Sequence, residues 1–183
     1  MSRKFGQAQK ATDCCFPWST DIQYLANVAV PSYASHLLRL TPDCRRARFG
    51  NFVSDNFIRA YADRFDCSNS LVLGCYVEGE VRASVELRSL SPTWGSRAEI
   101  AFSTEKPWRR GGMATALMCQ AVAAARRLDV RELFLSCHVF NRPMVCIAER
   151  ATAKLDFCDS ECFATICVDQ CLHSDVAAIL SDK

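Results

Sequence analysis

The sequence predicts a mixed α/β domain, in which a central sheet carries helices on both faces. Three stretches support this fold class. Residues 71–90 are typical of a β-hairpin, because two apolar arms flank a Glu-Gly-Glu turn. Residues 98–128 combine an alternating, strand-like segment with a long alanine-rich helix. The apolar run 132–139 precedes another helical pattern, and strands that alternate with helices are typical of α/β folds.

The first half of the chain supplies the first helices and the hairpin. We expect residues 34–40 to form the first strand, and Thr41-Pro42-Asp43 to be a turn or a helix start. Residues 51–65 are expected to be a helix, because their apolar side chains recur at spacings of three and four. Apolar and polar residues alternate in the second hairpin arm, which predicts one buried face. The predicted strands here are 71–77, 81–90 and 98–104.

The second half of the chain repeats the strand and helix pattern. Helices are expected at about 112–128 and 142–154, with a later strand at 162–168. Few polar residues interrupt 132–139, which predicts a strand covered on both faces. Ser174 is a candidate cap of a last short helix. Periodicity divides the chain into an N-terminal arm, residues 1–33, and a single domain, residues 34–183.

Composition and charge exclude several classes of protein. Half of the 183 residues are apolar, which suffices for the core of one domain. With 22 basic and 20 acidic residues, the net charge of +2 argues against nucleic acid or an anionic membrane as a partner. No apolar run approaches the roughly 18 residues of a membrane helix, and the N-terminus lacks the apolar core of a secretory signal. We therefore expect a cytoplasmic protein.

The chain contains twelve cysteines. A disulfide scaffold is not expected in a chain of this length without a secretory signal. Zinc is an alternative, because two Cys-x3-Cys pairs, 158/162 and 167/171, have His173 nearby. The segment between the pairs is typical of a strand, however. We therefore expect mostly buried, reduced thiols and no metal site.

The stretch Trp108–Met118 contains the most informative motif. Two arginines and two glycines, at 109–112, separate a strand from a helix. The first backbone N–H groups of a helix have no intrahelical partner and lie at the positive end of its dipole. Glycines let a ligand approach the main chain, and arginines add forked donors. Such a helix start is suited to binding a pyrophosphate.

The order Arg109-x-x-Gly112-x-Ala114 resembles the Arg/Gln-x-x-Gly-x-Gly/Ala signature of the GNAT acyltransferase superfamily. The order of elements resembles that fold over roughly residues 34–168. The resemblance implies a V-shaped cleft where two parallel strands, 98–104 and 132–139, splay apart and accept acetyl-CoA. One departure is that Arg110 precedes Gly111, whereas many members have these two residue types the other way round.

The resemblance also implies which residues hold acetyl-CoA. The loop would bind the pyrophosphate, and the main chain of strand 98–104 would bind the pantetheine arm. Asn141 matches an asparagine that often contacts the cofactor, and a helix cap before Arg142-Pro143 is a compatible alternative. The predicted contacts are Phe102, Ser103, Thr104, Arg109, Arg110, Gly111, Gly112, Met113, Ala114, Thr115 and Asn141.

Acyl transfer to an amine needs a base that takes the proton of the amine. Glu99 is our candidate, because its segment resembles the strand that carries a glutamate base in histone-acetylating members. A solvated surface residue is the alternative for Glu99. Glu86 is a second candidate, although alternation places it outward, beside Arg88.

The acid that protonates the leaving thiolate is less defined. Many GNAT enzymes carry a tyrosine on the helix after the asparagine, where this chain has Ala148. Ser136 is our candidate for this role. Cys137, His138 and a thiolate that leaves unprotonated are the alternatives.

Together these features predict an acetyl-CoA-dependent N-acyltransferase. Its acceptor is an amine of a small molecule or a protein, which no motif in residues 41–66 or 89–96 identifies. The missing tyrosine favours a competing interpretation, a CoA-binding sensor or interaction domain without catalysis. A homodimer remains one alternative for the assembly.

Overall fold

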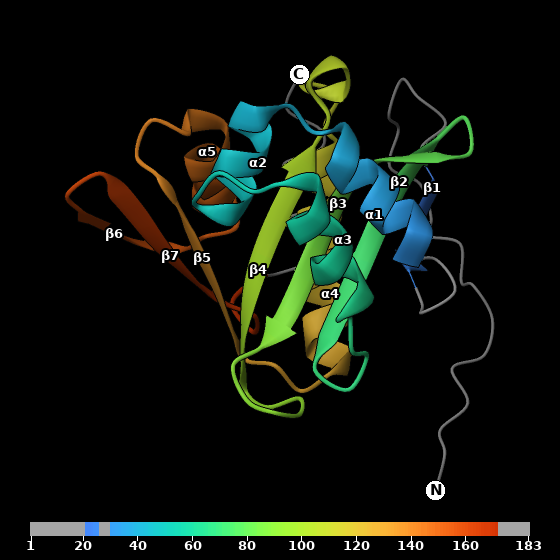
Figure 1. Ribbon diagram of the computed structural model, residues 1–183. Helices are drawn as coiled ribbons and strands as arrows, with labels where there is room; N and C mark the ends of the chain where they lie inside the picture. The colour runs from blue at the N-terminus through green and yellow to red at the C-terminus, as the bar shows by residue number, and fades with distance from the viewer. Residues whose placement is uncertain (1–20, 26–29, 172–183) are drawn as a thin grey trace, which may run out of the picture.

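The computed structural model describes residues 21–25 and 30–171. These form one seven-stranded sheet in the order β1-β2-β3-β4-β5-β7-β6, with helices on both faces (Figure 1). The strands are β1 (Asp21–Leu25), β2 (Ser70–Val77), β3 (Glu80–Ser89), β4 (Arg97–Thr104), β5 (Glu132–His138), β6 (Lys154–Cys158) and β7 (Glu161–Cys167). The helices are α1 (Val30–Arg39), α2 (Pro42–Phe49), α3 (Asp55–Asp63), α4 (Met113–Arg127) and α5 (Arg142–Arg150), with a short 3-10 turn η2 (Lys106–Trp108). The predicted fold class is confirmed.

The parallel pair β4 and β5 splits the sheet. All other neighbouring strands are antiparallel. The pairing of β4 with β5 covers only Arg97–Glu99 and Glu132–Phe134, whereas β5 pairs with β7 along its whole length. Beyond residue 99, β5, β6 and β7 therefore turn away from β4 (Figure 1). This divergence positions the site described below.

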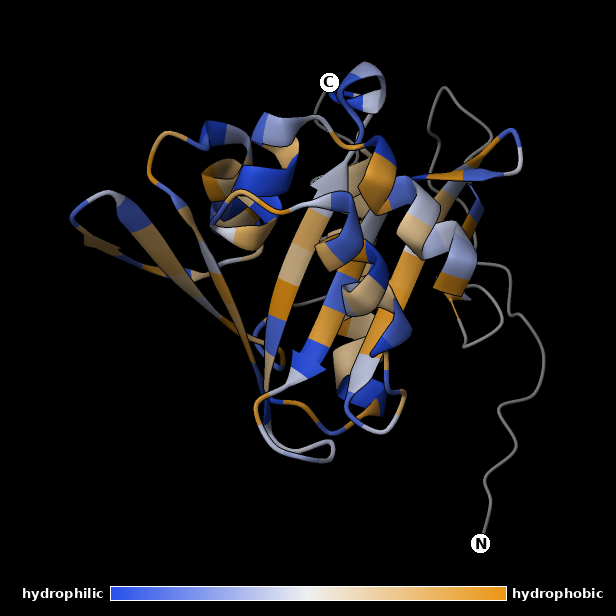
Figure 2. Cartoon of the chain, viewed as in Figure 1, coloured by the Kyte–Doolittle hydropathy of each residue, from blue (hydrophilic) through white to orange (hydrophobic). Residues whose placement is uncertain are grey.

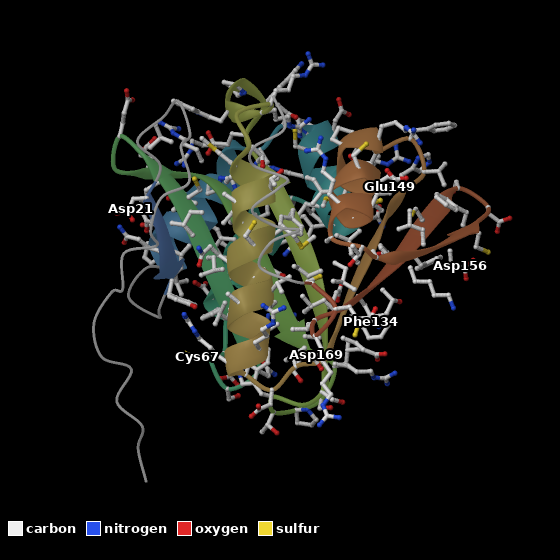
Figure 3. All side chains as sticks on the ribbon, turned by 180° about the vertical axis from the view of Figure 1, so that it is seen from behind. Asp21, Cys67, Phe134, Glu149, Asp156 and Asp169 are labelled. Atoms are coloured by element: carbon white, nitrogen blue, oxygen red, sulfur yellow. The ribbon has the colours of Figure 1, made fainter. Side chains whose placement is uncertain are left out.

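Helices cover the two faces of the sheet unequally. Helices α1, α2 and α3 lie on one face (Figure 1), and α4 and α5 lie on the other (Figure 3). Leu117 and Ala121 of α4 pack on Val85 and Leu87 of β3 in the larger apolar core. A smaller core joins α1 and α3 to β2. Figure 2 shows apolar residues along the central strands and hydrophilic residues distributed over the covering helices.

Residues 34–40 do not form the predicted strand, because they belong to α1 and the turn after it. Tyr33, Leu37 and Leu40 recur at helical spacing and are buried. The first strand is instead β1, which pairs antiparallel with β2. Thus β1 and the start of α1 are parts of the fold, although the prediction assigned them to an arm, residues 1–33.

Other element predictions differ from the structure in smaller ways. The helix predicted at 51–65 begins later, because the Ser54 Oγ accepts a hydrogen bond from the Phe57 N–H at 3.2 Å and caps α3. Strand β5 is not covered on both faces: Leu133 and Leu135 are buried, but Ser136 is exposed. The reason is that none of the described helices lies over the second face of this divergent half-sheet. The predicted cap Ser174 lies outside the described residues.

The polar face of β3 is buried, whereas alternation predicted that it would face solvent. Ser84 is 1% exposed and Glu86 is 3% exposed. Helices α1 and α3 pack over this face and bring their own polar side chains to it. The polar side of the hairpin is therefore an interior network, which lies beside the cleft.

Candidate functional site

A cleft of about 1270 Å³ opens where β4 and β5 diverge. One half lies between β4, β5 and the first turns of α4 and α5. The other half lies between the polar faces of β3 and β4 and the helices α2 and α3. All of the predicted site residues except Gly111 line this cleft. Their placement in one cavity is a structural finding, and the roles assigned to them remain predictions.

The start of α4 presents free donors to the cleft. Gly112 occupies the N-cap position in the left-handed conformation, with φ of 81°, and no side chain caps the helix. The first helical hydrogen bond runs from the Ala116 N–H to the Gly112 carbonyl at 3.0 Å. The N–H groups of Met113, Ala114 and Thr115 therefore have no intrahelical partner. With no acidic residue in its first turn, this helix start suits an anion.

Arg109 joins the loop to its surroundings. Its Nε donates to the Thr104 carbonyl at 3.3 Å, and its Nη2 donates to the Cys44 Sγ at 3.0 Å. The same sulfur accepts a hydrogen bond from the Thr41 hydroxyl at 2.8 Å. Arg109 thus links the loop, the end of β4 and the start of α2. Two of its guanidinium nitrogens, Nε and Nη2, are used in these structural contacts.

Arg110 has a strained backbone, with φ of 63°. A non-glycine residue in the left-handed region costs roughly 1–2 kcal/mol, because its Cβ crowds the following carbonyl. Gly111 does not share this conformation, so the glycine stands one position after the strain. With the commoner order of these two residue types, a glycine would stand at position 110 and the strain would be absent.

We expect Arg110→Gly to stabilise the folded protein. Relief of the strain outweighs the extra chain entropy of glycine by up to about 1 kcal/mol. Urea denaturation of the ligand-free protein measures this difference. Arg110→Gln is the matched control, because it removes the charge and keeps the strain. Equal stabilities for the two variants would show that the backbone at residue 110 stores no strain.

The main chain of β4 is open to the cleft beyond Glu99. Since pairing with β5 stops there, the peptide groups that face β5 have no strand partner among the described residues. The Ser103 side chain points to the face of the sheet that α1 covers and is buried there. Its Oγ is 2.8 Å from the Nε2 of His36 and 2.8 Å from the Ser84 Oγ. The predicted contacts of this segment therefore involve its backbone, not the Ser103 hydroxyl.

His36 and Glu105 complete this buried chain. The Glu105 carboxylate accepts hydrogen bonds from the Nε of Arg39 at 2.9 Å and from Arg82 at 3.2 Å, and lies 3.1 Å from the His36 Nδ1. Burial raises the pKa of Glu105, but the bonds to His36 and Arg39 outweigh burial and lower it overall. Burial lowers the pKa of His36. His36 is therefore neutral at pH 7, donates through Nδ1 and accepts from Ser103.

Glu86 lies at the centre of a second network, in the half of the cleft under α2 and α3. Its Oε2 accepts hydrogen bonds from the hydroxyls of Tyr33 at 2.7 Å and Tyr61 at 2.6 Å, and from Arg48 at 2.7 Å. Its Oε1 accepts from Arg88 at 2.8 Å. The expected outward position of Glu86 is therefore wrong. Two guanidiniums and two hydroxyls occupy its oxygens, so it is not free to take a proton from an amine.

The partners of Glu86 keep fixed protonation states. Burial raises the pKa of Tyr33 well above its usual value and that of Tyr61 to about 12, so both are neutral donors at pH 7. Burial opposes the charge on Arg48 and Arg88, but their acidic neighbours raise both pKa values overall. Both arginines therefore stay charged.

Glu99 is an exposed carboxylate of the cleft, as are Asp43 and Glu161, and it alone of these three lies on β4. It lies opposite Arg88 in the pairing of β3 with β4, but Arg88 turns to Glu86. Among the described residues Glu99 forms no ion pair. Ser136 is exposed on β5, two residues after Phe134, the parallel partner of Glu99. The two predicted catalytic side chains therefore lie on the same face of the sheet.

The sequence has a match to one family model, described as the acetyltransferase (GNAT) family, over residues 37–151. The chain belongs to this family. The matched segment runs from α1 to the end of α5 and includes both walls of the cleft. No curated protein sequence matches the chain significantly.

Solved GNAT structures share the fold. The GNAT domain of S. lividans PAT is 17% identical, with a TM-score of 0.68, covering 81% of this chain and 90% of that one. RimL, the ribosomal L7/L12 alpha-N-protein acetyltransferase in complex with coenzyme A, is 13% identical, with a TM-score of 0.63. The match covers 82% of this chain and 94% of RimL. A Salmonella typhimurium acetyl transferase that modifies the N-terminal serine of L7/L12 is 16% identical, with a TM-score of 0.60. The match covers 80% of this chain and 92% of that one. At such identities these likenesses show the fold alone.

The acid candidates of this GNAT protein differ in exposure. Ala148, at the position of the GNAT tyrosine, is buried. Burial raises the pKa of Cys137 to about 11, which keeps it a protonated thiol. His138 is exposed and its ring lies 5.1 Å from that of Phe140. Asn141 holds the N-cap position of α5, but its side chain makes no capping hydrogen bond, so it is available to the cleft.

Several residues of the site were not found by sequence reasoning. Tyr33 and His36 lie on α1, at or beside the segment predicted as a strand, and Arg48 lies on α2. Tyr61 was assigned to an apolar helical stripe. One signal was available: tyrosine and arginine on helices that face an alternating strand often hydrogen-bond its polar residues when both are buried.

Two predicted absences concern only the described part of the chain. Within it, no group of three or more His, Cys, Asp or Glu side chains is arranged to hold a metal. His173 lies outside it, so the predicted lack of zinc stays a prediction. Of the described cysteines, Cys67, Cys146 and Cys158 are exposed, so burial is less general than expected. No described helix has the length and apolar character to cross a membrane.

Proposed function

We propose that this GNAT protein is an acetyl-CoA-dependent N-acyltransferase that moves an acetyl or other acyl group to an amine. One observation carries the proposal: a single cleft combines an uncapped helix start, an open main-chain edge on β4 and the exposed carboxylate of Glu99. Membership of the acetyltransferase family supports the reaction class. The amine belongs to a small molecule or to a protein, and we place the activity in the cytoplasm.

The residues of the cleft fit acetyl-CoA, which supplies an activated thioester when bound. The free N–H groups of Met113, Ala114 and Thr115 suit the pyrophosphate, and Arg110 adds a positive charge beside them. The open peptide groups of β4 around Phe102 suit the amides of the pantetheine arm. The uncapped side chain of Asn141 is a further polar contact.

The chain supplies the groups that move protons. Glu99 takes the proton of the acceptor amine, which must be neutral to attack. Its exposure, with no arginine turned toward it, leaves the carboxylate free for this task. Ser136, on the opposite wall, donates a hydrogen bond to the departing thiolate and relays a proton to it from solvent, so that the hydroxyl itself keeps a proton. The network around Glu86 holds α1, α2 and α3 against β3 and so shapes the acceptor side.

A CoA-binding sensor without catalysis is the second candidate. Ala148 in place of the GNAT tyrosine favours it, because the structure offers no other tyrosine on α5. A panel of amines with acetyl-CoA, followed by thiol release, separates the two functions. Release that depends on the amine supports the transferase, and binding without release supports the sensor.

We expect coenzyme A to raise the melting temperature of the protein. At ligand near 100 times its Kd, binding to the folded state adds about 2.7 kcal/mol of stability. For a domain of this size the melting temperature should rise by roughly 5 to 10 °C. Differential scanning calorimetry with and without coenzyme A measures the shift.

Gly112→Val is the control for this shift. Valine is strained at φ of 81° and places a branched side chain where a phosphate must approach the backbone. The variant should show little or no shift relative to its own ligand-free form. A flat response of the folded wild type at millimolar coenzyme A would contradict the pyrophosphate site.

A further inference from the structure

The acceptor side of the cleft has a floor with an excess of positive charge. Arg48 and Arg88 face a single carboxylate, that of Glu86. The tyrosine hydroxyls that complete this network are neutral at pH 7. One positive charge therefore remains uncompensated within the network. Arg48 and Arg88 both line the cleft, so this charge is available to a bound molecule.

Arg48 has a donor that the protein does not use. Its hydrogen bonds to Glu86, Tyr33 and Tyr61 all come from Nη2. Its Nε is buried without a partner, and only 7% of its side chain is exposed. A buried donor on a charged group is costly when unpaired, so native structures nearly always satisfy it. Arg82 has the other such Nε among the described residues, but Arg82 does not line the cleft.

Aromatic rings hold the two arginines in place. The Arg48 guanidinium lies 4.9 Å from the ring centre of Phe49 and 5.8 Å from that of Tyr61. The Arg88 guanidinium lies 5.1 Å from the Tyr61 ring. Phe49 and Tyr61 also contact each other edge-on, at 5.2 Å. Such packing fixes the direction of the donors before a ligand arrives, which favours binding of a planar anion.

The position of Glu99 sets how far the anion lies from the amine. Glu99 and Arg88 are opposite partners on adjacent antiparallel strands and share one face. Adjacent strands are about 4.8 Å apart. A molecule that brings its amine to Glu99 therefore lies one strand from the backbone of Arg88, whose guanidinium turns toward Glu86 on the same face. The two groups of that molecule are separated by only a few bonds.

We propose that the acceptor is an amine that carries a carboxylate a few bonds away, and that Arg48 and Arg88 bind this carboxylate. The proposal rests on the proposed acyl transfer and defines its substrate class. Two sources share this chemistry: a free amino acid, and a protein N-terminus whose first residue is acidic.

The experiment compares acceptors that differ only in the carboxylate. Glycine, L-alanine and L-glutamate are each paired with their carboxamides, and a short peptide amide beginning with Glu is paired with one beginning with Gln. We expect kcat/KM to favour the carboxylate member of at least one pair by roughly 10- to 100-fold, the range of a charge-assisted hydrogen bond. The α-amine of a carboxamide is less basic and more often neutral, so this preference runs against intrinsic reactivity. The free and peptide pairs distinguish the two sources.

Variants assign the preference to the two arginines. Arg88→Gln alters a side chain that is 43% exposed, so folding is expected to survive. It should raise KM for the carboxylate member and reduce the preference to a few-fold, with little change for the amide. Arg48→Lys keeps the charge but loses the fork, and should reduce the preference as well. Arg59→Gln is the matched control on α3, outside the cleft, and should retain the preference.

The outcomes separate this proposal from the proposed function. Equal kcat/KM within every pair, or a preference that survives both arginine variants, overturns the carboxylate site while acyl transfer stands. The carboxylate site is also overturned if every amine that the enzyme acetylates lacks a carboxylate. If no amine is acetylated, the acyl transfer fails. The site is then judged by melting temperature alone: the acids must raise that of the coenzyme A complex more than the amides do, and Arg88→Gln must abolish the difference.

Discussion

Replacement of Glu99 by glutamine is expected to lower kcat/KM for amine acetylation by about 10²- to 10⁴-fold, the usual effect of losing a general base. Glutamine keeps the size and the hydrogen bonding of the side chain but cannot take a proton. Glu99 is exposed on the cleft wall and forms no ion pair among the described residues, so the substitution should leave the fold unchanged. Rates measured below saturation across pH should also lose the limb that reports the base.

Two comparisons test whether this loss belongs to the chemical step. Coenzyme A should raise the melting temperature of Glu99→Gln as much as that of the wild type, because the predicted pyrophosphate contacts lie at residues 109–115. Glu149→Gln is the matched control: Glu149 is exposed on α5 (Figure 3) and does not line the cleft, so its activity should be normal. Full activity of Glu99→Gln with an unchanged pH profile would identify Glu99 as a surface residue. Bound water would then be the next candidate, since the network around Glu86 occupies that carboxylate.

The cofactor side of the cleft was accessible to sequence reasoning because its signals are local. Residues 109–115 follow one another in the chain, and a helix start needs no tertiary partner to expose its N–H groups. The alternation in residues 98–104 likewise predicted the strand that carries Glu99. The structure brings this segment and Ser136 to one cleft between β4 and β5. The resemblance to GNAT proteins implied a cleft at this place, where the two strands splay apart.

The acceptor side was not accessible, because it depends on which helix covers which strand. Tyr33, Arg48 and Tyr61 stand 53, 38 and 25 residues from Glu86 in the chain, and no periodicity links such positions. Alternation along β3 shows that two faces differ, but it does not show whether the polar face meets water or a helix. Because residues 34–40 were predicted as a strand, the prediction contained no helix that could bury this face.

In strand β5, sequence reasoning predicted more burial than the structure shows. Leu133, Phe134 and Leu135 are consecutive apolar residues, which is typical of a strand buried on both faces. Only the first and third are buried, because β5 leaves β4 and no helix in the described part of the chain covers its second face. Phe134 instead lies under the Arg97 guanidinium, 5.7 Å from the ring centre. A run of apolar residues therefore did not reveal the divergence that creates the cleft.

The second large effect is expected from Glu86→Gln, measured as loss of stability. The substitution leaves Arg48 and Arg88 as two positive charges with no carboxylate between them. Removal of one partner from a buried ion pair costs about 3–5 kcal/mol, because the remaining charge stays desolvated. Glu86 is 3% exposed and the Arg48 side chain 7%, so water does not screen their interaction effectively. Urea denaturation of the ligand-free protein measures the change.

The same measurement separates charge from packing. Glu149→Gln, on the exposed side of α5, should change stability by less than about 0.5 kcal/mol. The double variant Glu86→Gln/Arg48→Met should recover part of the loss, because it removes the uncompensated buried charge and keeps an apolar chain between Phe49 and Tyr61. A loss below about 1 kcal/mol for Glu86→Gln, within the range of an ordinary hydrogen bond, would contradict the assignment of Glu86 as the counter-charge of the two arginines. The two arginines would then hold their positions without the Glu86 carboxylate, through the aromatic rings against which they pack.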